Sequence, residues 1–188
     1  GDITTRLEWL RDYADRNREV VLLRRPASNA HGGRPGRCSE HLRGHTPPVT
    51  TTASGRPRII LDCDPGVDDA MAVIAAARWA DLVAITTVAG NVPLEHTTAN
   101  ACRLRELLGL DVEVHAGADQ PLVGLQGFAR HVHGETGLGD VVLPEPKRGP
   151  DSDRAVEFLV EATRAEEGLH LVPVGPLTNV ALALRADP

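Results

Sequence analysis

Four aspartates stand close together in LDCDPGVDDAMA, residues 61–72: Asp62, Asp64, Asp68 and Asp69. At a separation of 4 Å and an effective dielectric constant near 20, two carboxylates repel each other by about 4 kcal/mol. Carboxylates that converge on one point therefore need a cation or a shared proton. Because the available ligand atoms are hard oxygens, with no set of Cys and His, the segment favours Ca²⁺ or Mg²⁺ over zinc.

The aspartates lie where an apolar run changes into a helical pattern. Residues 58–63, RIILDC, predict a buried strand, and residues 67–80, VDDAMAVIAAARWA, predict a helix. Side chains two apart on a strand face the same way, so the first two aspartates share one side of the strand exit. The other two fall in the first helical turn, where the helix dipole favours a negative charge by about 0.3 to 1 kcal/mol. A plainer interpretation stays open, in which one aspartate caps the helix and the others are exposed acids.

The chain beyond this motif repeats the alternation of apolar runs and helical patterns. Strands are expected at 82–90, 112–117 and 169–175, helices at 94–109, 153–168 and 176–186, and a long loop at 117–152. Strands that are apolar throughout and alternate with amphipathic helices indicate a parallel sheet covered on both faces. The predicted fold class is α/β, a doubly wound, mainly parallel, Rossmann-like sheet with helices on both faces, truncated at the C-terminus.

Other polar groups are expected at the same edge of this sheet, because ligands of such folds bind beyond the carboxyl ends of the strands. Asn91 ends the segment TTVAGN and suits a hydroxyl or a carboxylate, although a lone asparagine is more often a turn residue. Val174, in PVGPLTN, has a backbone carbonyl that can face a cation. His131 and His133 lie in the long loop, where a histidine is usually solvated but can also supply a proton near neutral pH.

Charge is distributed unevenly along the chain. Residues 1–57 hold 10 of the 20 basic and 6 of the 26 acidic side chains, so residues 58–188 hold the other 10 basic and 20 acidic ones. This acidic body argues against a nucleic-acid partner and is compatible with a cation site. Residues 6–23 predict a short amphipathic helix, and residues 26–57, rich in Pro, Gly, Ser, Thr and Arg, predict a disordered linker. We therefore divide the chain into an N-terminal extension, 1–57, and a domain, 58–188.

The cysteines and the chain ends bear on the cellular setting. Cys38, Cys63 and Cys102 show neither C-x-x-C nor zinc-like spacing, so a reducing cytoplasm is the simplest expectation. The sequence has no run of about 18 apolar residues and no signal-peptide core, so neither a membrane-spanning nor a secreted protein is indicated. Because the chain begins with Gly1 rather than Met and ends directly after a helical pattern, we expect a fragment of a longer protein.

Four motifs carry a resemblance to a known family. In this order, LDCDPGVDDAMA, AITTVAGN, HVHGETGLG and LVPVGPLTNVALAL resemble the N-terminal half of the inosine-uridine preferring nucleoside hydrolases. The resemblance runs from Arg58 to Pro188 with few gaps, and the aspartate motif is highly specific. It implies hydrolysis of the N-glycosidic bond of ribonucleosides to base and ribose, in purine or pyrimidine salvage, with tightly held Ca²⁺. It also implies a homodimer or homotetramer of the full-length parent.

The resemblance implies a role for each candidate at the metal. Asp64 would be the general base on a calcium-bound water and a calcium ligand, together with Asp69 and the backbone carbonyl of Val174. The chemistry agrees, because glycosidic cleavage passes through an oxocarbenium-like state and needs a positioned, deprotonated water. A divalent ion lowers the pKa of such a water.

The resemblance also implies roles around the substrate. Asp68 and Asn91 would hold ribose hydroxyls. Asp62 would support the metal ligands from behind, and His133 would lie near the nucleobase and assist its departure.

One departure from the family remains. The family has a further metal-binding aspartate in its C-terminal half, which this chain lacks, and two carboxylates with one carbonyl fall short of the about 6 to 8 oxygens around Ca²⁺. We therefore expect the chain as given to be inactive or weakly active.

Two rival interpretations remain. One rival is a non-catalytic truncated domain with at most residual calcium or ribose binding. The other is an aspartyl-phosphate phosphatase with Asp62 as nucleophile, although the motif of that class usually continues into Thr or Val rather than Pro-Gly.

Overall fold

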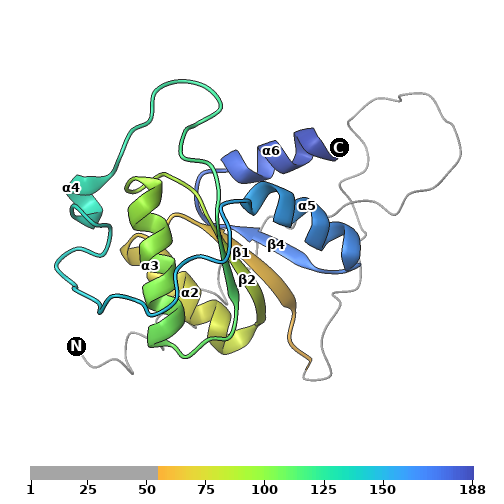
Figure 1. Cartoon of the computed structure of the whole chain (residues 1–188), viewed down its shortest axis with the longest axis horizontal. Helices are drawn as coiled ribbons and strands as arrows, with labels where there is room; N and C mark the ends of the chain where they lie inside the picture. The colour runs from red at the N-terminus through yellow and green to blue at the C-terminus, as the bar shows by residue number, and fades with distance from the viewer. Residues whose placement is uncertain (1–54) are drawn as a thin grey trace, which may run out of the picture.

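The sheet is parallel and has the strand order expected of a doubly wound domain. The computed structural model describes residues 55–188, so the helix expected at 6–23 and most of the expected linker lie outside the described residues. The sheet has the order β3-β2-β1-β4, and all pairs are parallel (Figure 1). Its strands are β1 (Arg58–Cys63), β2 (Asp81–Thr87), β3 (Glu113–Ala116) and β4 (His170–Pro173).

Helices connect the strands and cover both faces of the sheet. They are α2 (Val67–Trp79), α3 (Leu94–Leu107), α4 (Arg130–His133), α5 (Ala155–Ala165) and α6 (Thr178–Ala186). Figure 1 shows α2 and α3 on one side of the sheet and α5 and α6 on the other. The predicted α/β class, a parallel sheet with helices on both faces, is confirmed. No helix among residues 55–188 combines the length and apolar character needed to cross a membrane.

Adjacent residues of β1 face opposite cores, as the period of two along a strand requires. Ile59 and Leu61 pack in the core beneath α2 and α3, whereas Ile60 packs in the core beneath α5 and α6. Because both faces are covered, the strand is apolar from Ile59 to Leu61. Asp62 follows Ile60 by two positions and receives a hydrogen bond from Asn179 of α6.

Element ends differ from the predicted ones in places. β2 ends at Thr87 rather than at residue 90. The Val88 N–H still donates to Cys63 of β1, but the Ala89 N–H donates to Ala118, beyond the end of β3, and the Gly90 N–H to the Val92 carbonyl. Gly109 follows α3 as a C-terminal cap, because its φ is 61° and its N–H donates to the Glu106 carbonyl.

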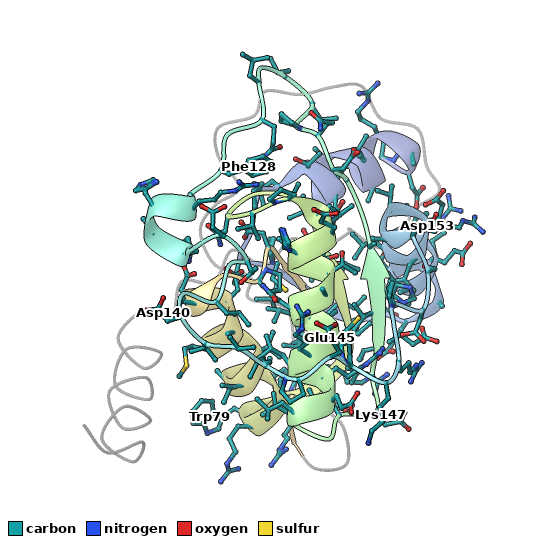
Figure 2. All side chains as sticks on the ribbon, turned by 60° about the vertical axis from the view of Figure 1, so that its left-hand side comes forward. Trp79, Phe128, Asp140, Glu145, Lys147 and Asp153 are labelled. Carbon is teal, nitrogen blue, oxygen red and sulfur yellow. The ribbon has the colours of Figure 1, made fainter. Side chains whose placement is uncertain are left out.

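The segment between β3 and α5 was expected to be a loop, and it contains only the single turn of α4. Figure 2 shows its later part running along the outer side of α3, with Glu145 and Lys147 beside that helix. Arg105 of α3 is 3% exposed and donates to Asp151 Oδ2 over 2.8 Å. This partly buried ion pair holds the segment against α3.

Candidate active site

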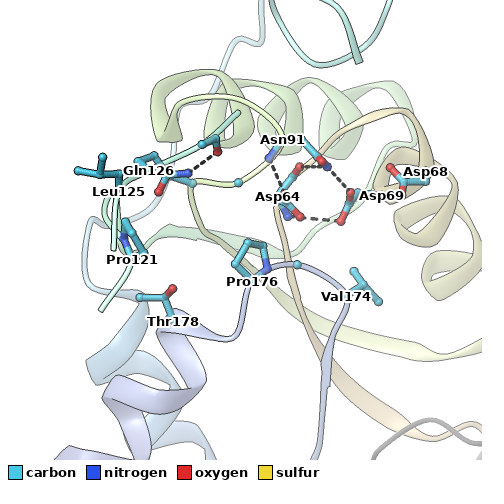
Figure 3. Close-up of a pocket in the computed structure, with 14 residues that line it drawn as sticks. Asp64, Asp68, Asp69, Asn91, Pro121, Leu125, Gln126, Val174, Pro176 and Thr178 are labelled. Carbon is cyan, nitrogen blue, oxygen red and sulfur yellow. Dashed lines mark hydrogen bonds between the residues drawn. The ribbon is translucent and has the colours of Figure 1, made fainter. Parts of the chain in front are cut away.

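A cavity of about 470 Å³ opens at the carboxyl ends of β1 and β4. The chain adds β2 and β3 on one side of β1 and β4 on the other, so this is the switch point of the sheet, where ligands of doubly wound folds bind. Asp64, Asp68 and Asp69 form one side of the cavity, here called the acidic wall (Figure 3). Pro121 and residues 125–127 form the opposite side, here called the loop wall.

Asp64 is buried at the centre of the acidic wall, with 5% of its surface exposed. Its Oδ2 accepts a hydrogen bond of 2.6 Å from the backbone N–H of Asn91. Gly90 and Gly175 leave the space for this carboxylate, because a Cβ at residue 175 would lie 2.7 Å from Asp64 Oδ1 and one at residue 90 would overlap Oδ2. Burial raises the pKa of Asp64 to about 6 against the opposing bond from Asn91.

Asp69 turns inward from the first turn of α2 and packs beside Asp64. Its Oδ1 accepts from the Asp64 N–H over 3.3 Å, and its Oδ2 accepts from the Gly66 N–H over 3.4 Å. Asn91 Nδ2 donates to the same Oδ2 over 3.1 Å. Burial, followed by the charges of Asp64 and Asp68, raises the pKa of Asp69 to about 7. The two buried acids thus meet near one point, and a positive charge there would favour their ionised forms.

Asp68 and Val174 lie on the cavity surface. The Asp68 side chain is 78% exposed, so the two neighbouring aspartates of α2 differ sharply in burial. Val174 follows β4 and lines the cavity. Its N–H donates to the Asp62 carbonyl over 2.8 Å, and this bond fixes the backbone that carries the Val174 carbonyl. Asn91 completes the group, because it lines the cavity and donates to both buried carboxylates.

Asp62 lies behind the cavity rather than on its surface. It is fully buried, and its Oδ1 accepts from Thr86 Oγ1 over 2.6 Å and from Asn179 Nδ2 over 2.8 Å. Its Oδ2 has no hydrogen-bond partner among the described residues. Burial raises the pKa of Asp62 to about 6 in spite of these two bonds.

The side chain of His133, the last residue of α4, packs against the start of α2. Its Nδ1 accepts from the Val67 N–H over 3.2 Å and lies 3.7 Å from Asp68 Oδ1. It is only 9% exposed and does not belong to the residues that line the cavity, whereas His131 is exposed. Gly66 permits this approach, because a Cβ there would lie 2.6 Å from His133 Nδ1.

Replacing His133 by alanine is expected to lower the free energy of unfolding by about 1 kcal/mol, because the first N–H of α2 loses its acceptor. Urea unfolding checks this value, with His131→Ala as the control at an exposed position of the same short helix. Equal effects of the two substitutions would contradict the capping role.

Two buried asparagines at the site were not singled out from the sequence. Asn100 of α3 donates to the carbonyls of Pro65 and Thr136, over 3.1 and 2.7 Å, and so holds the turn that follows Asp64. Asn179 of α6 bonds Asp62. In each case the sequence shows only a polar residue on an otherwise apolar helix face. Its hydrogen-bond partners lie 35 or more positions away in the chain, so local spacing does not reveal them.

The carboxylate oxygens of the acidic wall and the carbonyl oxygen of Val174 suit a hard cation. Asp64, Asp69 and the Val174 carbonyl would supply part of a shell. Among residues 55–188, no group of three or more His, Cys, Asp or Glu side chains is arranged to hold a metal ion. These residues therefore fit part of a calcium site, not a complete one.

The fold and the site define a doubly wound α/β domain with a carboxylate-lined cavity at its switch point. The family model of the inosine-uridine preferring nucleoside hydrolases matches residues 59–188, and the chain belongs to this family. The resemblance seen in the sequence motifs is thereby confirmed.

Individual relatives support this assignment. The chain is 44% identical over 134 residues to the pyrimidine-specific ribonucleoside hydrolase RihB of Escherichia coli K12. This match covers 70% of this chain and 43% of that protein. Among solved structures it resembles a plant nucleoside hydrolase, with 36% identity and a TM-score of 0.64, and an inosine-guanosine nucleoside hydrolase, with 37% identity and a TM-score of 0.61. Each structural match covers 70% of this chain and 43% of the other. The chain thus spans less than half the length of these relatives.

Proposed function

We propose that this chain carries the calcium- and ribose-binding side of a ribonucleoside hydrolase, which cleaves the N-glycosidic bond of ribonucleosides to free base and ribose. The observation that carries the proposal is the buried pair Asp64 and Asp69, joined through Asn91 at the switch point of the sheet. The relatives support the reaction class, because two are described as hydrolases of pyrimidine ribonucleosides and of inosine and guanosine.

Each residue of the site has a part in this chemistry. Calcium held by Asp64, Asp69 and the Val174 carbonyl would lower the pKa of a coordinated water. Asp64 would accept a proton from the attacking water, whose oxygen bonds to C1′ of the ribose while the bond from C1′ to the base nitrogen breaks; the base would leave with the bonding electrons and take a proton from solvent. Asp68 and Asn91, which line the cavity, would orient the ribose hydroxyls.

His133 and Asp62 act less directly in this proposal. The placement of His133 beside Asp68 and behind Gly66 keeps it within the site but off the cavity surface, so contact with a departing base requires movement of the loop. The phosphatase alternative is disfavoured, because Asp62 would have to attack a phosphorus atom and is fully buried behind the cavity.

The wider setting is part of the same proposal. We place the parent protein in the cytoplasm, as a homodimer or homotetramer in nucleoside salvage. The two cysteines within the described residues, Cys63 and Cys102, are free thiols, which suits a reducing compartment.

Calcium and ribose binding to the purified chain test the proposal. Isothermal titration is expected to detect calcium and, in its presence, ribose, and Asp69→Asn is expected to weaken calcium binding by at least about tenfold. Asp140→Asn is the matched control, because Asp140 is exposed and outside the cavity. Wild-type chain that binds neither ligand would favour the non-catalytic alternative.

Hydrolysis by the chain itself is expected to be absent or weak, because two carboxylates and one carbonyl leave the calcium shell short of about 6 to 8 oxygens. The release of base from inosine and uridine, followed by chromatography, checks this. Turnover that Asp64→Ala abolishes would show instead that these 188 residues suffice for catalysis.

A further inference from the structure

Asn179, the second residue of α6, is fully buried and makes three hydrogen bonds. Its Nδ2 donates to Asp62 Oδ1 over 2.8 Å and to the Thr87 carbonyl over 3.0 Å. Its Oδ1 accepts from the Ala118 N–H over 2.9 Å. Both amide hydrogens and the amide oxygen are therefore used, and their partners come from three different parts of the chain.

The three partners lie at the ends of three neighbouring strands. Asp62 precedes Asp64 of the acidic wall by two residues, and Thr87 ends β2 just before Ala89 and Asn91, which line the cavity. Ala118 begins the segment that leads to the loop wall. The Ala89 N–H also donates to the Ala118 carbonyl over 2.9 Å, which joins the second and third strand ends directly.

The surrounding backbone is shaped to admit this side chain. A Cβ at Gly117 would overlap the Asn179 amide, so the residue that follows β3 has to be glycine for the amide to reach Ala118. Thr178, the neighbour of Asn179 in α6, lines the cavity, so the start of α6 is held at the site by the same bonds. A buried amide left without partners is costly, which makes this arrangement sensitive to displacement of any one strand end.

We propose that Asn179 is a positioning residue that sets the distance between the acidic wall and the loop wall of the cavity. It acts through the Asp62 carboxylate, the Thr87 carbonyl and the Ala118 N–H, and it does not contact the ligand. The part of the test that uses ribose rests on the proposed function.

Asn179→Ala tests the proposal against two destabilising controls in the full chain. Val180→Ala and Leu159→Ala remove buried side chains of the core beneath α5 and α6 without touching the cavity. Urea unfolding is expected to give one control a smaller and the other a larger loss of unfolding free energy than Asn179→Ala. With calcium present, Asn179→Ala is expected to weaken ribose binding by about 10- to 100-fold, as loss of a residue supporting a ligand site does. The controls are expected to keep the wild-type affinity.

Amide hydrogen exchange gives a readout that needs no ligand. The N–H groups of Asn91 and Ala89, bonded to Asp64 and Ala118, are expected to exchange about tenfold faster in Asn179→Ala than in the controls. Asn179→Asp keeps the shape and the acceptor for Ala118 but loses both donors, so it is expected to weaken ribose binding at least as much as alanine does.

The outcomes separate the two proposals. If Asn179→Ala and the controls weaken binding and speed exchange equally, Asn179 is only a core residue and the positioning role is wrong. If the wild-type chain binds no ribose, the proposed function fails, while faster exchange at residues 89 and 91 in Asn179→Ala alone would still support the positioning role.

Discussion

Raising the pH from about 4 to about 7 is expected to destabilise the calcium-free chain by several kcal/mol. The reason is that Asp62, Asp64 and Asp69 have pKa values of about 6, about 6 and about 7 in the folded chain, against 3.8 for an ordinary aspartate. One pKa unit corresponds to about 1.4 kcal/mol. These three groups make the acidic wall and its support the main source of pH dependence in this range.

The sign follows from proton linkage. Between the two pKa values the folded chain binds more protons than the unfolded chain, so the free energy of unfolding falls as the pH rises. For Asp69, the stabilising contribution is complete below the unfolded pKa of 3.8 and is lost once the pH passes the folded pKa of about 7. Asp151 acts in the opposite sense: hydrogen bonds from Val114 and Arg148 outweigh its burial and lower its pKa, so its contribution is lost in acid.

Calcium is expected to reverse the loss, because a cation between Asp64 and Asp69 stabilises their ionised forms. At a concentration of 100 times the dissociation constant, a ligand that binds only the folded chain adds about 2.7 kcal/mol. Thermal unfolding between pH 4 and 8, with calcium or with a chelator, measures both effects. Asp69→Asn is expected to make the pH profile less steep, because Asp62 and Asp64 still titrate, and to remove most of the calcium effect; Asp140→Asn is expected to change neither. A flat wild-type profile would mean that the buried acids do not change protonation on folding.

Replacing Arg105 by alanine is expected to lower the free energy of unfolding by about 2 to 3 kcal/mol, because a partly buried, charged hydrogen bond is lost while Asp151 keeps Arg148 and the Val114 N–H as partners. Arg105 donates to Asp151 Oδ2 over 2.8 Å and to the carbonyls of Arg148 and Gly149 over 2.6 and 2.8 Å. Asp151 also accepts from the Val114 N–H over 2.9 Å, so the substitution leaves a carboxylate without its buried partner beside β3.

The control for this substitution is Arg130→Ala. Arg130 pairs with Glu135 over 3.1 Å, but its side chain is 44% exposed and that of Glu135 is 80% exposed, so a cost below about 1 kcal/mol is expected. Urea unfolding of both variants makes the comparison. Similar losses at the two arginines would show that burial of the Arg105 pair does not determine its contribution.

Local patterns in the sequence predicted the architecture well. The run at 58–63 and the helical spacing after Gly66 placed β1 and the start of α2 correctly, because the run is short, contains β-branched isoleucines and is followed by a Pro-Gly turn. Element ends were less predictable where tertiary hydrogen bonds decide them, as for the end of β2, where Ala89 bonds to Ala118 in the segment after β3. The same holds for α4, a single turn without a distinct sequence pattern.

Chain order is enough to determine which side chains gather at the carboxyl edge of the sheet. Asp64, Asp69 and Asn91 closely follow strands, and parallel strands end at one edge, so their convergence follows from their spacing along the sequence. The acidic charge of the cluster likewise follows from residue type alone, because four of the eight residues from 62 to 69 are aspartates.

Tertiary packing instead decides which of these side chains faces the cavity, which is buried and which supports its neighbours. Asp68 and Asp69 are neighbours in the sequence, yet one is exposed in the cavity and the other is buried against Asp64, because the packing of α2 on the sheet sets the rotation of the helix. Asp62 is supported by Asn179, which lies 117 residues away. Such contacts depend on the relative positions of whole elements, and those positions are fixed by the two cores and not by local residue spacing.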